Sequence, residues 1–198
     1  MKVTIVGTSH IAGESVRRVR ETIARQRPDL VAVELCPQRY YTLTHPQQRR
    51  LSLSNGLTTL LLSVLQQWLG RKMGIMPGSE MLEAVDAGRA EGAAVALVDE
   101  DIGSIAQGIM KVPAREKLKL FTGLFAGLRS GQKVDLSRQL PEKVVEEAMG
   151  YLRKELPGMY RVLVTDRNRL MAQRVRELGK RYKSIVLVVG AGHEQGME

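Results

Sequence analysis

Near its C-terminus the chain reads SIVLVVGAGHEQG, from Ser184 to Gly196. Its apolar, β-branched first half is typical of a buried strand, which here passes into glycines and then into His193. The N-terminus repeats the arrangement, because KVTIVGTSHIAG places a short apolar run before Gly7 and His10. Two strand patterns that each end in G-x-x-H, at opposite ends of one chain, predict that both histidines serve one site.

Four apolar segments have the length and composition of buried strands. They are 3–6, 30–34, 93–98 and 185–189, and stretches with helical periodicity or helix-start signals lie between them. Strands that are apolar on both faces and alternate with helices are typical of a parallel sheet covered by helices. The sequence therefore predicts an α/β fold: a small, mostly parallel sheet of about four strands, flanked by helices and carrying a helical insertion.

The length of 198 residues and the hydrophobic content of 43% suit one compact domain, which we expect to span residues 1–198. Within it we expect a helical insertion around 52–92 and a helical segment around 102–156, which a polar stretch at 129–141 interrupts. Further helices are expected at about 11–26, from Pro37 onward, from Asn55 to Trp68, within 77–92 and from Met159 to Tyr182.

Composition limits the classes of partner and of compartment. The formal net charge of +9 favours acidic partners, although a solvated basic surface explains the same charge without any partner. No helix-turn-helix, RNA-recognition or zinc-finger signature accompanies the charge, so nucleic-acid binding is the least favoured function. Cys36 is the only cysteine, which excludes an internal disulfide and a cysteine-rich zinc site. No secretory signal pattern and no apolar run of about 18 residues is visible in the sequence, and we expect a cytoplasmic or membrane-associated protein.

Each predicted strand leads into a polar residue that is capable of chemistry. His10 follows the first strand, Glu34 ends the second, Asp99 follows the third and His193 follows the fourth. Because the C-terminal ends of parallel strands lie on one edge of a sheet, where such sheets bind ligands, these residues are expected to meet. For Asp99 a helix-capping role explains the position equally well. His45 has no strand before it and is expected to be a surface residue.

The glycines near the histidines do not match a dinucleotide-binding loop. Glycines at 190, 192 and 196 have the wrong spacing for G-x-G-x-x-G, and no β-α-β unit follows them. We therefore expect no nucleotide cofactor, and we expect the glycines to provide turns that aim the histidines over the strand ends.

Two imidazoles and a carboxylate suit two kinds of chemistry. Together they form a common three-ligand set for a divalent ion with an open position, which lowers the pKa of bound water and polarises a carbonyl group. Without a metal, one histidine acts as a general base while the other stabilises an oxyanion. The pattern leaves these two alternatives open.

Six stretches of the chain resemble the TraB/PrgY (pheromone shutdown) family, which is related to the Tiki proteins. In chain order they are VGTSHI (6–11), VAVELCPQRY (31–40), GIMPGSEMLEAVDAG (74–88), LVDEDI (97–102), DRNRLMA (166–172) and VVGAGHEQG (188–196). The hallmarks of that family are two G-x-x-H motifs, a glutamate and an arginine. The resemblance places them on His10, on His193, on Glu34, and on Arg167 or Arg39.

The resemblance implies a metal-dependent hydrolase or peptidase that inactivates a peptide signal. Tiki proteins are described as metal-dependent proteases, pheromone shutdown proteins are credited with lowering peptide-pheromone activity, and related folds include erythromycin-esterase-like proteins. By resemblance, His10, Glu34 and His193 hold an Mn, Co or Zn ion and act on a peptide or protein substrate. Arg167 stabilises developing charge in this scheme, and the secondary candidates are Asp99, Asp101 and Arg39.

Two departures from the family pattern bear on these expectations. Where relatives often have D-R-D-I, this chain has Asp99-Glu100-Asp101-Ile102, so it lacks that basic residue. Many relatives carry membrane-spanning segments after the second G-x-x-H, so the full-length protein is expected to be cytoplasmic or associated with the membrane through a segment absent from this chain.

Other interpretations of the same residues stay open. The alternative function is a non-catalytic domain that sequesters or regulates peptides. Arg167 lies in a strongly basic stretch, where most arginines are simply solvated. The leucine- and methionine-rich segment of the predicted insertion is compatible with a homodimer interface.

Overall fold

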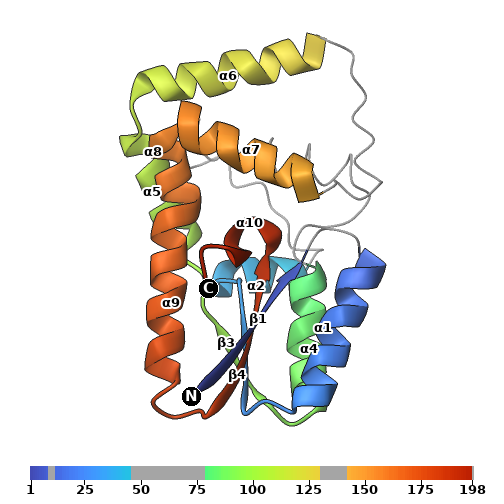
Figure 1. The fold of residues 1–198 in the computed structure, drawn as a ribbon. Helices are drawn as coiled ribbons and strands as arrows, with labels where there is room; N and C mark the ends of the chain where they lie inside the picture. The colour runs from blue at the N-terminus through green and yellow to red at the C-terminus, as the bar shows by residue number, and fades with distance from the viewer. Residues whose placement is uncertain (9–11, 46–78, 130–141, 198) are drawn as a thin grey trace.

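The computed structural model describes residues 1–8, 12–45, 79–129 and 142–197 (Figure 1). These residues contain one sheet of four strands in the order β1-β4-β2-β3, and every neighbouring pair is parallel. The strands are β1 (Lys2–Thr8), β2 (Leu30–Val33), β3 (Ala94–Leu97) and β4 (Ser184–Gly190). The predicted α/β class and the predicted parallel sheet are confirmed.

The register of the sheet brings the two G-x-x-H strands together. β1 and β4 pair along their whole length, from Lys2 opposite Ser184 to Thr8 opposite Gly190. The Thr8 hydroxyl also donates a hydrogen bond of 3.2 Å to the carbonyl oxygen of Val189. The two ends of the chain therefore form adjacent strands that stop at the same level of the sheet.

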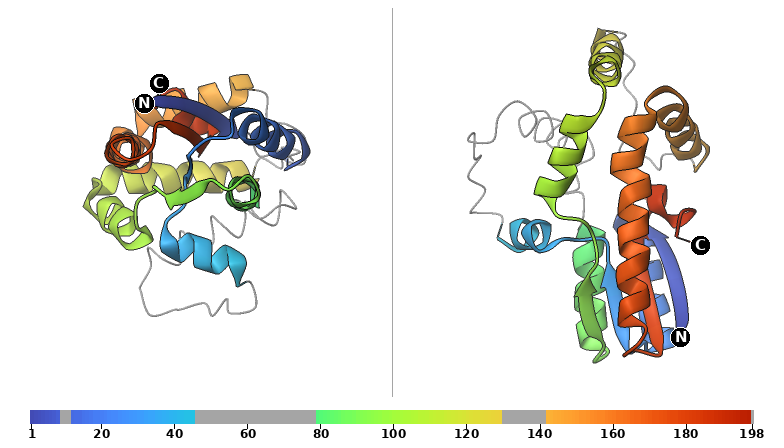
Figure 2. Two further views of the ribbon diagram at one scale, coloured as in Figure 1. Left: turned by 90° about the horizontal axis from the view of Figure 1, so that it is seen from below. Right: turned by 90° about the vertical axis from the view of Figure 1, so that its left-hand side faces the viewer.

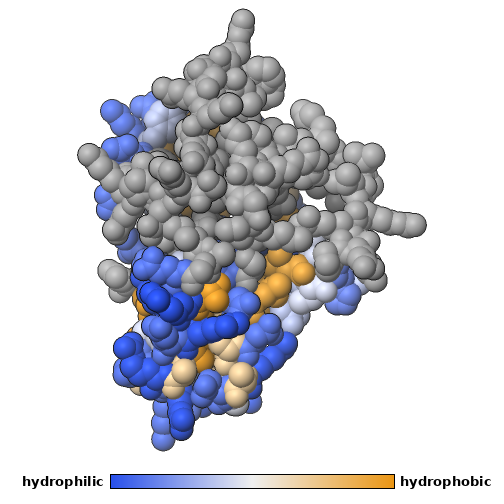
Figure 3. Space-filling model, turned by 90° about the vertical axis from the view of Figure 1, so that its right-hand side faces the viewer, coloured by the Kyte–Doolittle hydropathy of each residue, from blue (hydrophilic) through white to orange (hydrophobic). Residues whose placement is uncertain are grey.

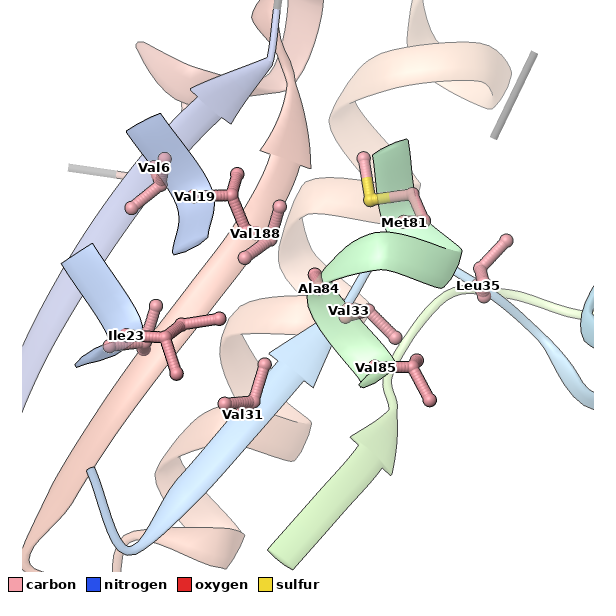
Figure 4. Close-up of a cluster of buried hydrophobic side chains, with 11 residues drawn as sticks. Val6, Val19, Ile23, Val31, Val33, Leu35, Met81, Ala84, Val85 and Val188 are labelled. Atoms are coloured by element: carbon pink, nitrogen blue, oxygen red, sulfur yellow. The ribbon is translucent and has the colours of Figure 1, made fainter. Parts of the chain in front are cut away.

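Apolar side chains bury both faces of the sheet. Helices α1 (Ala12–Gln26) and α4 (Ser79–Ala90) pack on one face, and α9 (Asp166–Leu178) packs on the other. Along β4 the side chains alternate between the two sides. The cluster beneath α1 and α4 includes Val6, Val19, Ile23, Val31, Val33, Met81, Val85, Val186 and Val188 (Figure 4). The cluster beneath α9 includes Leu30, Ala32, Met171, Val175, Ile185, Leu187 and Val189.

A second group of helices lies beyond the C-terminal ends of the strands (Figures 1 and 2). It contains α5 (Ile102–Lys111), α6 (Ala114–Arg129), α7 (Glu142–Glu155) and α8 (Pro157–Tyr160). A separate core of Ile109, Val112, Leu156, Met159 and Val162 holds much of it together. The described part of the helical segment predicted at 102–156 thus consists of three helices, α5, α6 and α7. Residues 130–141 of the predicted interruption lie outside the described residues.

The helix predicted from Met159 to Tyr182 contains an irregularity that no pattern indicated. Between α8 and α9 the chain forms a π-helical turn, η3 (Arg161–Thr165). The backbone N–H of Asp166 bonds to the carbonyl oxygen of Arg161, five residues earlier. Such turns often occur at functional sites, and this one ends two residues before Arg167.

Most of the predicted insertion at 52–92 lies outside the described residues, and so does the helix expected from Asn55 to Trp68 on which the homodimer prediction rests. Its described end, α4, packs beside α1 on the sheet. In the coloured part of Figure 3, hydrophilic residues are the more numerous, with hydrophobic ones between them. Among the described residues, no helix combines the length and the hydropathy that crossing a bilayer would require. α2 (Pro37–Thr44) begins at Pro37 as expected.

The packing of α9 on the sheet generates a stability prediction. Met171 is fully buried, whereas Met110 on α5 is 62% exposed. We expect Met171→Ala to lower the free energy of unfolding by about 2–5 kcal/mol, because it leaves a cavity beneath α9. The matched variant Met110→Ala should change it by less than about 0.5 kcal/mol. Urea unfolding followed by circular dichroism measures both, and equal midpoints for the two variants would contradict this view of the core.

Candidate functional site

A single guanidinium group joins the ends of two strands. Arg167 on α9 donates from Nε to Asp99 Oδ1 and from Nη2 to Asp99 Oδ2, both at 2.8 Å. Its Nη2 also donates to Oε1 of Glu34, and its Nη1 donates to the carbonyl oxygen of Leu163 at 3.1 Å. The Arg167 side chain is 11% exposed and those of Glu34 and Asp99 are 9% and 0% exposed. The solvated surface position considered for Arg167 is therefore wrong.

His193 completes this cluster from the short helix α10 (Ala191–Glu194), which follows β4. Its Nδ1 lies 2.6 Å from Oδ1 of Asn168, and its Nε2 lies 3.0 Å from Nη1 of Arg167. Because an amide oxygen only accepts hydrogen bonds, the ring proton is assigned to Nδ1. The Nε2 lone pair then accepts a hydrogen bond from Arg167, and it lies 3.3 Å from Oε1 of Glu34.

Burial and neighbouring charges fix the protonation states in the cluster. Burial lowers the pKa of His193; Glu34 opposes this shift and Arg167 adds to it. Burial alone would raise the pKa of Asp99, but the hydrogen bonds and charge of Arg167 outweigh it and lower that pKa. Although burial favours the neutral form of Arg167, Asp99 and Glu34 raise its pKa. At pH 7 the cluster therefore holds a charged guanidinium, an ionised Asp99 and a neutral imidazole.

Glu34 links β2 to the end of β4. Its Oε2 accepts a hydrogen bond of 2.7 Å from the backbone N–H of Gly190. Its own backbone N–H donates to the carbonyl oxygen of Val188 at 3.0 Å, which extends the ladder between these strands. One carboxylate therefore contacts Arg167 with one oxygen and holds the start of the His193 turn with the other.

Asp99 and Asp101 have different roles. Asp99 accepts an additional hydrogen bond of 3.1 Å from Arg39, and its backbone carbonyl accepts one of 2.6 Å from Arg174. Asp101 is the N-cap of α5, where its side chain accepts a hydrogen bond of 2.7 Å from the backbone N–H of Gly103. The capping interpretation weighed for Asp99 thus applies to Asp101, which makes none of the hydrogen bonds of the cluster. Arg39 and Arg167 both contact the same carboxylate.

The two G-x-x-H segments also contact each other through Gly7. Its backbone N–H donates a hydrogen bond of 3.1 Å to Oε1 of Glu194, and a Cβ at this position would lie 1.9 Å from Oε2. Gly7 therefore permits a close approach. Gly190, with φ −66° and ψ 150°, has a backbone conformation that any residue adopts, so the turn at this position does not require a glycine.

Not every predicted site residue is placed by the structure. Glu34, Asp99, Arg167, His193 and Arg39 are brought into one network. His10 lies outside the described residues, two positions beyond the end of β1. His45 is an exposed surface residue, as expected, and stacks on Tyr41.

Several members of the network were missed from the sequence. Asn168, which fixes the His193 ring, directly follows Arg167 in the DRNRLMA stretch but has no periodicity that marks it. Arg174 lies two residues past the same stretch and donates a hydrogen bond to the backbone carbonyl oxygen of Asp99. The one available signal for Asn168 was its position directly after Arg167 in a stretch that resembles the family.

The donors for a metal ion are incomplete in the described part of the chain. No group of three or more His, Cys, Asp or Glu side chains is arranged there to hold an ion. Glu34 and His193 are two members of the predicted set of three, and His10 is outside the described residues. Arg167 donates hydrogen bonds to both available donor atoms, the Nε2 of His193 and the Oε1 of Glu34.

Comparison with known proteins matches the whole chain. A family model described as "TraB/PrgY/gumN family" matches residues 1–198. An uncharacterized protein of Methanocaldococcus jannaschii is 32% identical, over 98% of this chain and 52% of its own length. "TraB domain-containing protein" of Bos taurus is 27% identical and that of Homo sapiens is 26% identical, over all of this chain and 62% of each relative. The chain thus spans roughly half to three fifths of these relatives.

The close approach of Gly196 to Asn168 gives a prediction for the His193 ring. A Cβ at Gly196 would lie 2.0 Å from Nδ2 of Asn168, a buried side chain that must then move. We expect Gly196→Ala to disturb the Asn168–His193 hydrogen bond, to mix the two neutral tautomers, and to lower the free energy of unfolding by about 1–3 kcal/mol. Nitrogen NMR of the labelled imidazole reports the tautomer.

The matched control for this prediction is Gly192→Ala. The new methyl group there would lie 3.5 Å from the Met149 sulfur, which is an ordinary contact. The His193 signals should keep their wild-type positions in this control. If Gly196→Ala also leaves the His193 signals unchanged, Asn168 does not fix the ring.

The buried neutral imidazole generates a pH dependence of stability. The fold lowers the pKa of His193 from the usual 6.5, near which the unfolded chain titrates. Below that pH the unfolded chain binds more protons than the folded chain. We therefore expect the free energy of unfolding to fall as pH drops from 6.5 towards the lowered pKa. Urea unfolding of wild type and His193→Gln measures this: the variant should lose part of the slope, and identical slopes would contradict the assignment.

Proposed function

Because the chain belongs to the TraB/PrgY/gumN family, we propose that it is a hydrolase that cleaves peptide bonds at the cluster of Glu34, Asp99, Arg167 and His193. One observation carries this proposal. A neutral imidazole, whose Nε2 lone pair is fixed in direction, lies 3.0 Å from a buried guanidinium and 3.3 Å from a carboxylate. Amide hydrolysis needs a proton acceptor beside a group that stabilises an oxyanion, and these residues supply both. The peptide as substrate class follows the resemblance to the pheromone shutdown and Tiki proteins.

The residues of the cluster have distinct roles in this proposal. Nη1 of Arg167 donates a hydrogen bond to the substrate carbonyl oxygen. This frees the Nε2 lone pair of His193, which accepts a hydrogen bond from Nη1 in the free protein. His193 then accepts a proton from water as the water oxygen bonds to the carbonyl carbon. When the C–N bond breaks, His193 returns that proton to the leaving amine. Asp99 and Glu34 hold Arg167 in place, and Asn168 keeps the other ring nitrogen protonated.

A divalent ion is proposed as a cofactor on the chemistry of the donors. Neutral His193 donates its Nδ1–H to an amide oxygen, an arrangement that commonly orients a metal-binding histidine, and Glu34 offers a carboxylate oxygen beside Nε2. With His10 as the third ligand, a bound Mn, Co or Zn ion would supply an activated water and polarise a carbonyl. Arg167 donates hydrogen bonds to both described donor atoms, so Glu34 and His193 would hold an ion only where Arg167 no longer occupies them.

A non-catalytic, peptide-sequestering domain is the second candidate. The observation that favours it is the completeness of the polar network. Among the described residues, no buried side-chain nitrogen or oxygen lacks a hydrogen-bond partner. Arg167 therefore also fits a purely structural role, in which one buried guanidinium neutralises two strand-end carboxylates.

Peptide cleavage decides between these candidates. A mixed peptide library is incubated with the protein, with chelator or with Mn, Co or Zn, and products are identified by mass spectrometry. We expect wild type to release new termini, and His193→Ala to be slower by about 10²–10⁴-fold. Arg167→Lys keeps the charge but loses the forked geometry and should cost about 10²-fold or more. Arg181→Lys, at an exposed position, is the matched control.

Each outcome of this experiment has a definite meaning. Full activity of the His10→Ala, His193→Ala double variant would refute the proposed site, provided that circular dichroism shows folded protein. Saturable peptide binding without products would favour the sequestering domain. Calorimetric titration with the same ions tests the cofactor: binding should disappear in His193→Ala and tighten in Arg167→Gln, and no binding in any variant would remove the ion from the proposal.

A further inference from the structure

A groove lined by arginines includes Asn168 in its wall. It has a volume of about 620 Å³ and is formed by the end of α7, the continuous helix from α8 to α9, and the last residues of the chain. In Figure 1 the C-terminus lies beside α9. Among the described residues that line it, none is a carboxylate and four are arginines: Arg153, Arg161, Arg169 and Arg176.

The charge in this groove is largely uncompensated. Arg161 is 3.8 Å from Asp166, an exposed pair that contributes little. Within the described part of the chain, Arg153, Arg169 and Arg176 form no ion pair with a carboxylate. Four guanidinium groups around one concavity create a positive potential that attracts anions. Arginine is also the side chain best suited to bind carboxylates in a forked geometry.

The length of the helix face that lines the groove indicates the length of ligand that it fits. Positions 161, 165, 169, 172 and 176 follow one another at three- and four-residue intervals, so they lie on one face of the helix. From 161 to 176 this face is about 22 Å long at 1.5 Å per residue. An extended peptide covers that distance with about six or seven residues at roughly 3.3 Å each.

The lining favours a peptide over a nucleic acid. Single-stranded nucleic acids are usually held by aromatic side chains on which successive bases stack. Tyr160 is the one aromatic residue in the described lining of the groove. Hydrogen-bond donors without stacking surfaces suit carboxylate side chains along a peptide.

The groove shares a wall with the candidate active site. Asn168 lines the groove, and its Oδ1 lies 2.6 Å from Nδ1 of His193. Gly196, which lies against Asn168, lines the same groove. A ligand in the groove therefore contacts the residue that fixes the tautomer of the imidazole.

We propose that this groove binds an acidic peptide segment in an extended conformation, with carboxylates on Arg153, Arg161, Arg169 and Arg176. The choice of a peptide rests on the proposed function, because a peptidase needs a surface that holds its substrate beside the reacting residues. It narrows the substrate class to peptides that carry a run of acidic residues near the cleaved bond.

The test is a binding measurement that needs no turnover. Fluorescence anisotropy of fluorescein-labelled hexaglutamate is recorded at about 0.1 M salt, where exposed charges more than about 10 Å apart are screened. Saturable binding is expected for wild type, and the double variant Arg169→Gln, Arg176→Gln should bind at least about tenfold more weakly. The matched double variant Lys180→Gln, Arg181→Gln loses the same charge outside the groove and should bind within about twofold of wild type.

Three results would overturn the proposal. Absence of saturable hexaglutamate binding to wild type is the first. Equal weakening in both double variants is the second, because it indicates general attraction to a basic protein. Tighter, groove-dependent binding of a labelled single-stranded hexanucleotide is the third, and it would assign the groove to nucleic acid. Because hexaglutamate need not be cleaved, a failure of peptide hydrolysis leaves this test unaffected, and a failure of binding leaves the cleavage experiment unaffected.

Discussion

The buried guanidinium of Arg167 is the interaction on which the site depends. It contacts carboxylates that follow β2 and β3, a carbonyl in the π-helical turn, and the imidazole that follows β4. Breaking such a buried pair by removing one partner costs about 3–5 kcal/mol, because the remaining charges are left without compensation. Arg167 donates hydrogen bonds to both Glu34 and Asp99, so its charge fixes the ends of β2 and β3 relative to α9.

The sheet makes this arrangement possible. A parallel sheet that is apolar on both faces places the C-terminal ends of all its strands at one edge, and Glu34, Asp99 and His193 follow the strands there. The pairing of β1 with β4 brings the two ends of the chain together at that edge. α9 lies against the sheet because Met171 and Val175 pack on it. The π-helical turn ends just before α9, whose first turn contains Arg167 and Asn168.

The chemistry of the cluster comes from the contrast between its two nitrogen groups. The guanidinium stays charged because two carboxylates surround it, whereas the imidazole stays neutral because it is buried beside that positive charge. A fixed cation beside an unprotonated nitrogen combines charge stabilisation with proton transfer. In the structure the Nε2 lone pair of His193 is occupied by the hydrogen bond from Nη1 of Arg167.

The sequence by itself determined the elements of the fold and most of the polar residues at the sheet edge. Short apolar runs identified the four strands of the sheet, because such a run is a local signal that can be read from the sequence. The alternation of these runs with helices along the chain indicated a parallel sheet. Glu34, Asp99, Arg167 and His193 were recognised from strand ends and from a family resemblance. Only the tertiary structure decided which aspartate is a cap, which arginine is buried, and that Asn168 orients His193. These contacts join residues up to 133 positions apart, and a hydrogen bond depends on distances of a few tenths of an ångström that no local pattern encodes.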